Sequence, residues 1–519
     1  MNPAQLLAHF DRISDAPDAI PRLRQLILNL AVRGKLVEQD QRYEPAECLL
    51  TLEQRVDAKR AVKPLSDDLP KGWANVFLGQ LIALKKGKKP AVLNEEGRGL
   101  PYLDIAALER GELRQFTEDE KCPRATSNDL IVVCDGSRSG LLLDGREGII
   151  GSTLAVIQFS GFMREYLRVL LNALYEDLNA AKKGAAIPHL NIPRLLSLYV
   201  DLPPLAEQYR IVAKVNELMA LCDRLEASQA EQESRRDRLA ASSLQRLNQP
   251  AEESSAFREH ARFALDNLPR LTTRPEHIQQ IRQTILNLAV RGKLVPQDPK
   301  DKPAPVFAIE KCAEEENRIQ LRLPLGWSWV RVEDVAEARL GKMLDKAKNS
   351  GKAYRYLRNT NIHWFDVRMD ELKDLRIEAN EVEKYVLRNG DVLICEGGHG
   401  IGRTAVWRGM ETNIIFQKAL HRVRPGQALN SEFFAYCVCV YFHAGVLQSY
   451  FTGVGIPHFT GVALSRLVFP LPPINEQHRI VAKVEELMAL CDCLEAQLTT
   501  TQTESRRLLE ATLHYALSA

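Results

Sequence analysis

Long apolar runs and a dominant sign of charge are both missing from this sequence of 519 residues. No stretch approaches the ~20 consecutive apolar residues that a membrane-spanning helix needs. Lys and Arg number 69 and Asp and Glu 67, which leaves a net charge of only +2. Any affinity for nucleic acid must therefore come from local basic patches. The first residues also lack the basic start and apolar run of a secretory signal, so we expect a cytoplasmic protein with no membrane partner.

Motifs that carry catalysis are missing as well. There is no G-x-x-x-x-G-K-[ST] phosphate loop, no Asn/Asp-Pro-Pro-aromatic motif of an adenine methyltransferase and no clear acidic-plus-lysine nuclease constellation. The histidines, among them His189 and His458 in a shared Ile-Pro-His context, do not come with a nucleophile and an orienting group. We therefore expect a protein that binds and has no catalytic residues of its own.

Two features could suggest a cofactor or a metal. The stretch Gly400–Ala405, "GIGRTA", has the glycine spacing of a dinucleotide or S-adenosylmethionine loop, but such a loop should open a helix and "TAVW" is typical of a strand. A tight turn that lets the backbone approach another surface, such as DNA, is the better interpretation. The pairs Cys437/Cys439 and Cys491/Cys493 lie in apolar periodic runs without the second ligand pair of a zinc site. We expect buried thiols, no cofactor in this chain and no metal.

The strongest signal is a duplication. The block "RQLILNLAVRGKLVEQD" at Arg24–Asp40 returns at Arg282–Asp298 with 15 of 17 residues identical. The block "LPPLAEQYRIVAKVNELMALCDRLEA" at Leu202–Ala227 returns at Leu471–Ala496 with 21 of 26 identical. A Pro-Ala pair and a Gly-Trp pair recur in the same order, whereas the inserts between Gly-Trp and the double proline hardly agree. A whole module has been duplicated, in which the shared blocks keep one shape and the inserts are free to differ.

The longer block predicts a helix. Two prolines suit its start, and apolar residues then follow at alternating spacings of four and three, the a/d pattern of a coiled coil. We expect the first copy to run to about Asn248 and the two copies to pair antiparallel. The predicted seam consists of Ile211, Val215, Leu218, Cys222 and Leu225 in the first copy and of Ile480, Val484, Leu487, Cys491 and Leu494 in the second.

Each insert alternates short apolar strands with turn residues, which predicts two α/β (α+β) domains. Basic residues cluster in both inserts. Lys and Arg neutralise phosphates, and Arg and Asn can contact guanine and adenine edges. One basic run is most often only a solvated loop, but basic loops in both inserts favour DNA binding. The candidate contacts are Lys85, Lys86, Lys88 and Lys89 (placed in one loop), Arg138, Lys182 and Lys183 in the first insert, and Lys342, Lys346, Lys348, Arg355, Arg358, Asn359, Asn361, His399 and Arg403 in the second.

These blocks together resemble a known family. The tandem order, with "ILNLAVRGKLV" and "LPP..EQ.RIVAKV" each written twice and "GDVLICEGGHGIGR" in the second insert, is similar to the DNA-specificity subunit of type I restriction–modification systems. The resemblance covers essentially the whole chain. It implies that each insert is a target-recognition domain for one half of a bipartite site in double-stranded DNA. It also implies two methylation subunits and up to two restriction subunits as partners, which would bind S-adenosylmethionine, ATP and Mg²⁺.

On this interpretation the chain has two globular target-recognition domains separated by two long antiparallel helices, in a pseudo-two-fold tandem duplication. The alternatives are a coiled-coil scaffold that binds proteins without DNA, and a nucleotide-cofactor enzyme that uses the 400–405 loop. The expected segments are 1–68 (first short helical block), 69–203 (first domain), 204–248 (first long helix), 249–322 (linker and second short helical block), 323–472 (second domain) and 473–519 (second long helix).

Overall fold

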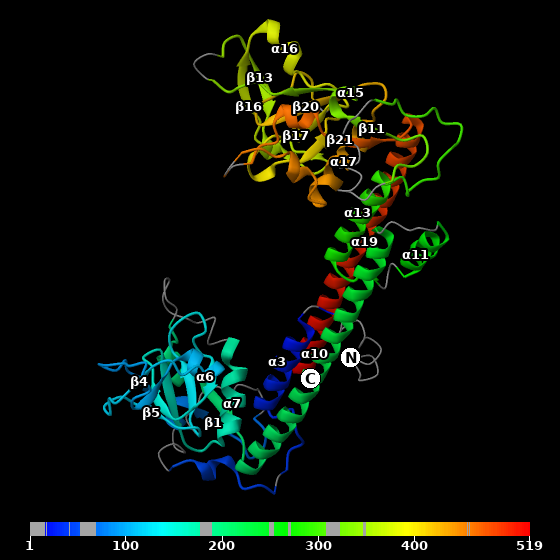
Figure 1. Cartoon of the computed structure of the whole chain (residues 1–519). Helices are drawn as coiled ribbons and strands as arrows, with labels where there is room; N and C mark the ends of the chain where they lie inside the picture. Colours follow the sequence, from blue (N-terminus) through cyan, green and yellow to red (C-terminus); the bar gives the residue numbers. More distant parts are fainter. Residues whose placement is uncertain are drawn as a thin grey trace. The chain divides into compact units, whose positions relative to one another are not determined.

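The computed structural model describes residues 16–518, except for 17, 41, 52–68, 177–188, 249–253, 268–270, 308–321, 346–348, 410, 454 and 456. The chain divides into two compact units. The first comprises Met1–Glu231 together with Gln502–Ala519, and the second comprises Gln232–Thr501. Each unit contains one globular domain of strands and short helices and a set of longer helices (Figure 1). The mixed α/β class and the duplicated plan predicted from the sequence are confirmed.

The globular part of the first unit is built on two four-stranded sheets. Residues of β6 alternate between two apolar clusters, because successive side chains of a strand point to opposite faces. Leu130 and Val132 belong to one cluster and Ile131 and Val133 to the other. The first sheet has the order β2 (Ile82–Lys86), β9 (Leu154–Phe159), β6 (Leu130–Val133), β7 (Leu142–Asp144), and the second has the order β4 (Phe116–Thr117), β3 (Leu100–Leu103), β8 (Gly148–Ile150), β5 (Arg124–Ala125).

Short elements complete this domain. Strands β1 (Ala74–Phe77) and β10 (Tyr199–Leu202) pair antiparallel and bring the two ends of the insert together. Asp104 starts α6 by accepting a hydrogen bond from the Ala107 backbone N–H, as expected of an N-cap. The remaining elements are η1 (Ala46–Leu49), α5 (Leu78–Leu81), α6 (Ile105–Arg110), α7 (Arg164–Ala173) and α9 (Ile192–Leu196).

The second unit repeats this plan. Its first sheet has the order β12 (Ala336–Leu340), β20 (Leu420–Pro425), β17 (Val392–Cys395), β18 (Thr404–Val406), which corresponds strand for strand to β2-β9-β6-β7. The other strands are β16 (Lys373–Ile377), β13 (Lys352–Leu357) and β19 (Ile415–Phe416), β14 (Ile362–His363) with β15 (Asp366–Val367), and β11 (Ser328–Arg331) with β21 (Val468–Leu471). The shorter helices are α15 (Val332–Val335), η2 (Asn359–Asn361), α16 (Ala379–Tyr385), η3 (Gly398–Gly400), α17 (Ser431–His443), η4 (Leu447–Tyr450) and α18 (Gly461–Ser465).

Two long helices follow the two domains. They are α10 (Leu205–Asn248, 44 residues) and α19 (Ile474–Ser518, 45 residues), each about 66 Å long at 1.5 Å per residue. The helices α3 (Ala19–Val32) and α13 (Pro275–Val290) come from the other repeated block, and α11 (Ser254–Asp266) lies between α10 and α13 in the chain. None of the described helices has an apolar stretch long enough to cross a membrane.

The short helices fix the direction of the long ones within each unit. In the first unit Arg24 of α3 pairs with Asp223 at 2.7 Å, while Ala31, further along α3, packs in one cluster with Ile211. Helix α3 is therefore antiparallel to the start of α10. The end of α19 runs parallel to α3, because Arg22 pairs with Glu510 at 3.0 Å.

The second unit shows the same arrangement with the roles of the long helices exchanged. Arg282 of α13 pairs with Asp492 of α19 at 2.6 Å. The end of α10 runs parallel to α13, with Asp237 at 2.9 Å from His277 and Asn248 at 3.1 Å from Thr284. In each unit, segments of the two long helices therefore run in opposite directions beside one short helix, as the antiparallel prediction requires.

The predicted seam is buried mainly by the short helices and the domain cores. Ile211, Val215 and Cys222 are buried in α10, and Ile480, Val484 and Cys491 in α19. Leu218, Leu487 and Leu494 are partly buried. The prediction is wrong at Leu225, which is 40% exposed, because Arg24 contacts α10 at this level through ion pairs with Asp223 and Glu226.

The packing of α10 continues along its second half, where Ala240, Ser243 and Leu247 are buried. The prediction of four buried thiols needs one correction. Of the four paired cysteines, Cys437, Cys439 and Cys491 are buried as expected, whereas Cys493 is exposed. Cys493 replaces Arg224 of the first copy and lies on the outward face of its helix, which explains its exposure.

Candidate nucleic-acid interface

One edge of the first sheet collects most of the polar candidates of the first domain. Strands β2 and β6 run parallel to each other, since each pairs antiparallel with β9. Both therefore end at the same edge, and the turn from β6 to β7 lies there too. Lys86 ends β2, Lys88 and Lys89 follow it, and Arg138 lies in the turn. We call this edge, with the turn Asp135–Gly140, the first reading edge.

The second domain has the same edge, formed by the turn from β17 to β18. The two turns match residue by residue. Gly140 N donates to Val133 O at 2.7 Å, and Gly402 N donates to Cys395 O at 3.0 Å. Glycine occupies matching left-handed positions in both turns, with φ of 106° at Gly136 and 77° at Gly398, a conformation that other residues adopt with strain. The 400–405 stretch therefore closes a β-hairpin and starts no long helix, which argues against a dinucleotide loop.

The predicted lysine loop of the first domain is only partly a loop. Lys85 and Lys86 belong to β2, so their side chains point to opposite faces. Lys86 Nζ lies 3.1 Å from Asp135 Oδ2. All four lysines of this segment are exposed, and Lys88 and Lys89 make no ion pair with any residue that the structure describes. Lys86, Lys88 and Lys89 are therefore accessible cations at the reading edge.

A histidine faces each reading turn. His189 Nδ1 lies 2.7 Å from Asp135 Oδ1, and His458 Nδ1 lies 3.8 Å from Glu396 Oε1. Burial alone would raise the pKa of Asp135, but hydrogen bonds from His189 and Lys86 outweigh it and lower that pKa. The two histidines were noted in the sequence for their shared Ile-Pro-His context, but they were not chosen as contacts, because a repeated motif alone does not show what it faces.

The second reading edge has a different set of side chains. The side-chain amide of Asn359 lies beside Gly398. A Cβ atom added to this glycine would be 3.3 Å from Asn359 Nδ2. The side chain of Arg403 lies over Gly400, whose missing side chain leaves space for it. Lys418, just before β20, is exposed at the same edge, and no repeated pattern in the sequence pointed to it. Asn359, Arg403 and Lys418 are the candidate contacts of this edge.

Several predicted contacts are already occupied within the protein. Lys342 is largely buried and paired with Glu381 and with Glu378 at 3.6 Å, which raises the pKa of the lysine. Asn361 is 3% exposed, and its amide donates to Arg368 O at 3.0 Å and Asp370 O at 2.9 Å, while its oxygen accepts from Arg358 N. These side chains hold the fold of their own domain, and their contact with DNA stays a prediction.

Three predicted arginines have carboxylate partners. Arg138 pairs with Glu109 at the first reading edge, and Arg355 on β13 pairs with Glu411 at 2.7 Å. Arg358 is mostly buried, lies 3.8 Å from the Glu371 carboxylate and donates to the Glu371 backbone carbonyl at 2.9 Å. A DNA phosphate would have to displace these partners. The predicted contacts Lys182, Lys183, Lys346 and Lys348, and the side chain of His399, lie outside the described residues.

The repeated blocks meet at a joint between each domain and its long helix. Trp73 Nε1 donates to Glu207 Oε2 at 2.9 Å, and Gln39 Nε2 donates to Glu207 Oε1 at 2.7 Å. Gly34 is required nearby, since a Cβ on it would lie 2.6 Å from Pro70 Cγ. The joint thus unites "RGKL", "LP.GW" and "LPP..EQ", three blocks that are far apart in sequence.

The second domain has an equivalent joint. Trp327 Nε1 donates to Glu476 Oε2 at 3.1 Å. Gln477 accepts from Asn430 N at 2.7 Å and donates to Ala428 O and Pro472 O, each at 2.9 Å. The neighbouring Gln208 of the first joint makes the corresponding bonds to Met163 N, Gly161 O and Pro203 O. The shared residues therefore fix each domain on its helix in the same way.

Both buried glutamates of the joints have raised pKa values. Glu207 and Glu476 are each 1% exposed. Burial raises the pKa of each carboxyl, and the hydrogen bond from the tryptophan indole only partly offsets that effect. A buried carboxyl held by a tryptophan at the start of a helix suits a structural role.

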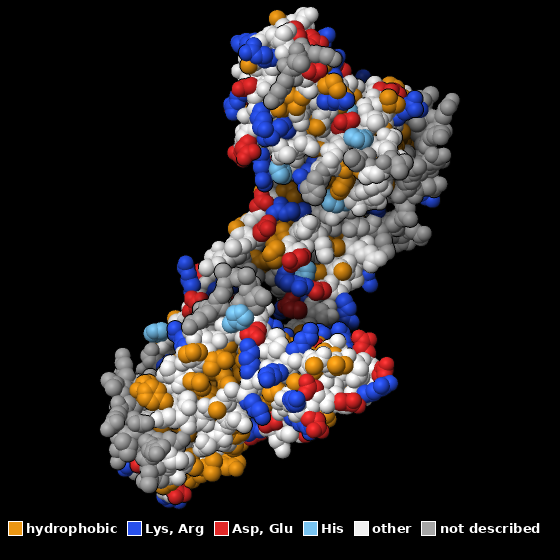
Figure 2. Space-filling model, turned by 90° about the vertical axis from the view of Figure 1, so that its left-hand side faces the viewer, with side chains coloured by type: hydrophobic (Ala, Val, Ile, Leu, Met, Phe, Trp, Pro, Cys, Tyr) orange, Lys and Arg blue, Asp and Glu red, His pale blue; other side chains and the backbone are white. Residues whose placement is uncertain are grey.

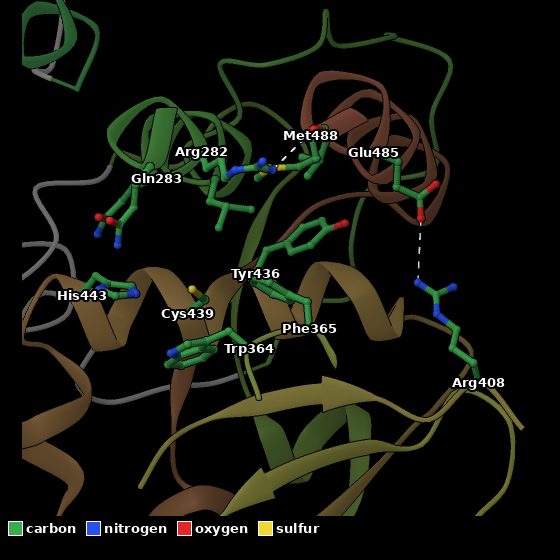
Figure 3. A pocket seen from close by; sticks show the side chains of 13 residues that line it. Arg282, Gln283, Trp364, Phe365, Arg408, Tyr436, Cys439, His443, Glu485 and Met488 are labelled. Carbon is green, nitrogen blue, oxygen red and sulfur yellow. Dashed lines mark hydrogen bonds and ion pairs between the residues drawn. The ribbon is translucent and has the colours of Figure 1, made fainter. Parts of the chain in front are cut away.

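A cavity of about 420 Å³ lies in the second unit, between α13, α17 and α19. Trp364, Phe365, Tyr436 and Met488 give it a mostly apolar lining (Figure 3). At its rim Arg408 pairs with Glu485 at 3.9 Å, and Arg282 pairs with Asp492 at 2.6 Å. Cys439 and His443 of α17 also line the cavity. No group of three His, Cys, Asp or Glu side chains, within the described ranges, is placed to hold a metal ion.

The surface charge agrees with the sequence. Figure 2 shows Lys and Arg side chains interspersed with Asp and Glu on the visible face of each globular domain. No single basic field dominates that face, so any contacts with phosphates would have to come from local basic groups.

Comparisons with known proteins agree on one family. The model of the type I restriction modification DNA specificity domain matches residues 70–233 and again 324–501. The specificity subunit of type I restriction enzyme EcoAI from Escherichia coli is 28% identical, covering 96% of this chain and 94% of the relative. The EcoEI specificity subunit from the same species is 24% identical, with coverage of 96% and 94%. The crystal structure of the HsdS subunit from Thermoanaerobacter tengcongensis is 21% identical, with a TM-score of 0.44, covering 88% of this chain and 99% of that chain.

Proposed function

This chain belongs to the type I restriction–modification DNA specificity family, and from that membership we propose that each of its two globular domains reads one half of a bipartite DNA site. The domains are residues 69–203 and 323–472. The two reading edges supply the contacts, and the long helices set the distance between the half-sites. In this proposal the same surfaces direct both adenine methylation and restriction to one sequence.

The observation that carries the proposal is the contrast between joints and edges. The two joints repeat the same pairs, Trp73 with Glu207 and Trp327 with Glu476. The two reading edges share their turn geometry and differ in side chains, with lysines at one and Asn359 and Arg403 at the other. A protein that holds two different surfaces in one repeated frame is suited to two different half-sites. A scaffold without DNA binding would not need turns with exposed cations at matching edges.

We further propose that the chain binds and does not catalyse, and that partner subunits supply the chemistry. S-adenosylmethionine would be held by two methylation subunits, and ATP and Mg²⁺ by up to two restriction subunits, in the cytoplasm. The outward faces of the long helices are the proposed docking surfaces for the methylation subunits. Leu221 and Leu490 occupy equivalent positions there and are 40% and 54% exposed. Two identical apolar surfaces suit two identical partners.

Methylation sequencing of the host genome, before and after deletion of the gene for this chain, tests the proposal. A bipartite motif with a methylated adenine in each half, lost on deletion, is the expected result. Methylation that persists without the chain, or no bipartite motif in the parent strain, would contradict the proposed function.

A further inference from the structure

The histidine at each reading turn is held in a way that leaves one ring nitrogen for another molecule. His189 pairs through its backbone with Asp135, and Leu190 N donates to Cys134 O at 2.8 Å, so the residue is fixed beside the turn. Its Nδ1 is taken by the Asp135 carboxylate at 2.7 Å. Its side chain is 53% exposed, and Nε2 has no hydrogen-bond partner within the described part of the chain.

The second domain repeats this placement with a different carboxylate. His458 pairs through its backbone with Gly397, the residue that matches Asp135, and Phe459 N donates to Glu396 O at 2.7 Å. The carboxylate comes from Glu396, one position earlier in the turn, and lies 3.8 Å from His458 Nδ1. The side chain of His458 is 47% exposed. Although the acidic residue has moved, the imidazole still meets a carboxylate through the same nitrogen.

From this repeated geometry we infer that His189 and His458 each contact a DNA phosphate through Nε2, one in each half-site, with the ring in its protonated form. The inference rests on the proposed function, because it assumes that the reading edges face DNA. The phosphate would accept the Nε2–H. On the other side of the ring, Asp135 accepts the Nδ1–H of His189 at 2.7 Å, and the Glu396 carboxylate lies 3.8 Å from Nδ1 of His458 as an ion-pair partner. An imidazolium between two anionic groups is favoured by both.

The groups around each histidine are either paired or neutral, so protonation of the imidazole is what changes the charge of the edge. His189 faces the carboxylate of Asp135, which also pairs with Lys86. The adjacent Cys134 is neutral, because burial raises the pKa of its thiol to about 11. His458 faces Glu396, behind which His421 is buried, and that burial lowers the pKa of His421. Without DNA, Lys86 and Asp135 balance each other, so protonation of His189 adds one net positive charge to the edge.

This assignment makes DNA binding take up protons. Since an imidazole changes charge between about pH 5 and 8, the affinity of the complex for its site should rise as the pH falls through that range. Each histidine should account for one phosphate contact, which corresponds to about 0.9 units in the slope of log affinity against log salt concentration. These contacts position the domain and carry no sequence preference.

The experiment uses the complete complex purified with the full chain and the duplex mapped by methylation sequencing. His189→Gln and His458→Gln should each weaken binding about five- to tenfold at pH 6, have little effect at pH 8.5, and flatten the salt slope by about one unit. Single phosphates of the duplex are then replaced by neutral methylphosphonates. In each half-site, one replacement should weaken binding by the parent complex but not by the variant that lacks the histidine of that half. His260→Gln, on α11 outside both domains, is the matched control and should behave like the parent.

A second variant separates the ring from its carboxylate. Asp135→Asn should move the pH dependence that belongs to His189 to lower pH, because the imidazolium loses its anionic partner. If the parent complex binds its duplex selectively and both Gln variants keep the parent's pH dependence and salt slope, the inference is overturned but the proposed function is not. A loss confined to one base pair would replace the phosphate contact with a base contact and overturn it as well. Failure of the parent complex to select any bipartite duplex would overturn the proposed function together with the inference.

Discussion

The indole nitrogen of Trp73 donates a hydrogen bond of 2.9 Å to the buried carboxylate of Glu207, the third residue of the first long helix. The same bond joins Trp327 and Glu476 in the second repeat, at 3.1 Å. Each bond connects the start of a domain to the start of the helix that follows its end. The orientation of a domain on its helix is thus fixed by residues that are identical in the two copies, whereas the reading edges are free to differ.

Removing the carboxylate should destabilise the first unit. In Glu207→Ala, Trp73 Nε1 and Gln39 Nε2 lose the buried carboxyl and keep Gln39 Oε1 at 3.2 Å and Gly34 O at 3.0 Å as acceptors. The loss of these hydrogen bonds to a buried carboxyl should cost about 1–3 kcal/mol. Glu207→Gln keeps an oxygen for the indole and should cost less. Glu217→Ala is the control on the same helix, since its exposed ion pair with Lys214 should contribute under about 0.5 kcal/mol. Denaturant unfolding measures all three, and equal losses in the Glu207→Ala and Glu217→Ala variants would mean that the joint is not a stabilising contact.

The joints should also leave a signature in the pH dependence of stability. Because the pKa values of Glu207 and Glu476 are raised above the ordinary 4.5, the folded chain binds these two protons more tightly than the unfolded chain does. Their contribution to the free energy of unfolding therefore falls as the pH rises from about 4.5 through the raised values, and levels off above them. The parent should lose stability relative to a Glu207→Gln/Glu476→Gln variant over that range. If the free energy of unfolding of the parent, minus that of the variant, stayed constant or increased as the pH rose, the assignment would be contradicted.

Two asparagines of the second domain should have opposite effects. Asn361→Ala leaves three part-buried backbone groups without their amide partner and should reduce the stability of the domain by about 1–3 kcal/mol with no change in the recognised sequence. Asn359→Ala should leave stability within about 0.5 kcal/mol and cost about 1–3 kcal/mol of DNA binding at one base position. Thermal unfolding and a mismatch series on the mapped duplex measure the two effects. If the two phenotypes were exchanged, our assignment of the second reading edge would be wrong.

The long helices should act as a ruler. Seven residues inserted in heptad phase after Glu231 of α10 and after Thr501 of α19 fall at the boundaries of the two units and leave the contacts within each unit intact. They lengthen both helices by about 10 Å, which corresponds to about three base pairs of DNA at 3.4 Å per pair. Methylation sequencing should show a spacer longer by that amount with both half-sites unchanged. The same insertion between α10 and α11 is the control and should leave the spacer as it is, and an active double insertion with the original spacer would rule out the ruler.

The sequence predicted the frame better than the contacts. The a/d spacing and the double proline predicted the long helices, because local periodicity decides helix formation, and the strand-like "TAVW" correctly predicted β18. The role of Glu207 was not predicted, since its partners Trp73 and Gln39 come from blocks more than 130 residues away. Asn361 and Lys342 have the right chemistry for DNA, but only the fold shows that their polar groups are already used.

The most direct test of the account is an exchange of the first insert. Residues 69–203 are replaced by the corresponding insert of a relative with a known bipartite site, in which a tryptophan is retained at position 73, and the helix from Leu205 onward is unchanged. Methylation sequencing of cells that carry the chimera then reads both half-sites and the spacer. We predict that one half-site changes to that of the donor while the other half-site and the spacer stay the same. A change in both halves, or in neither, would contradict the claim that each domain reads its own half in a frame fixed by the repeated joints.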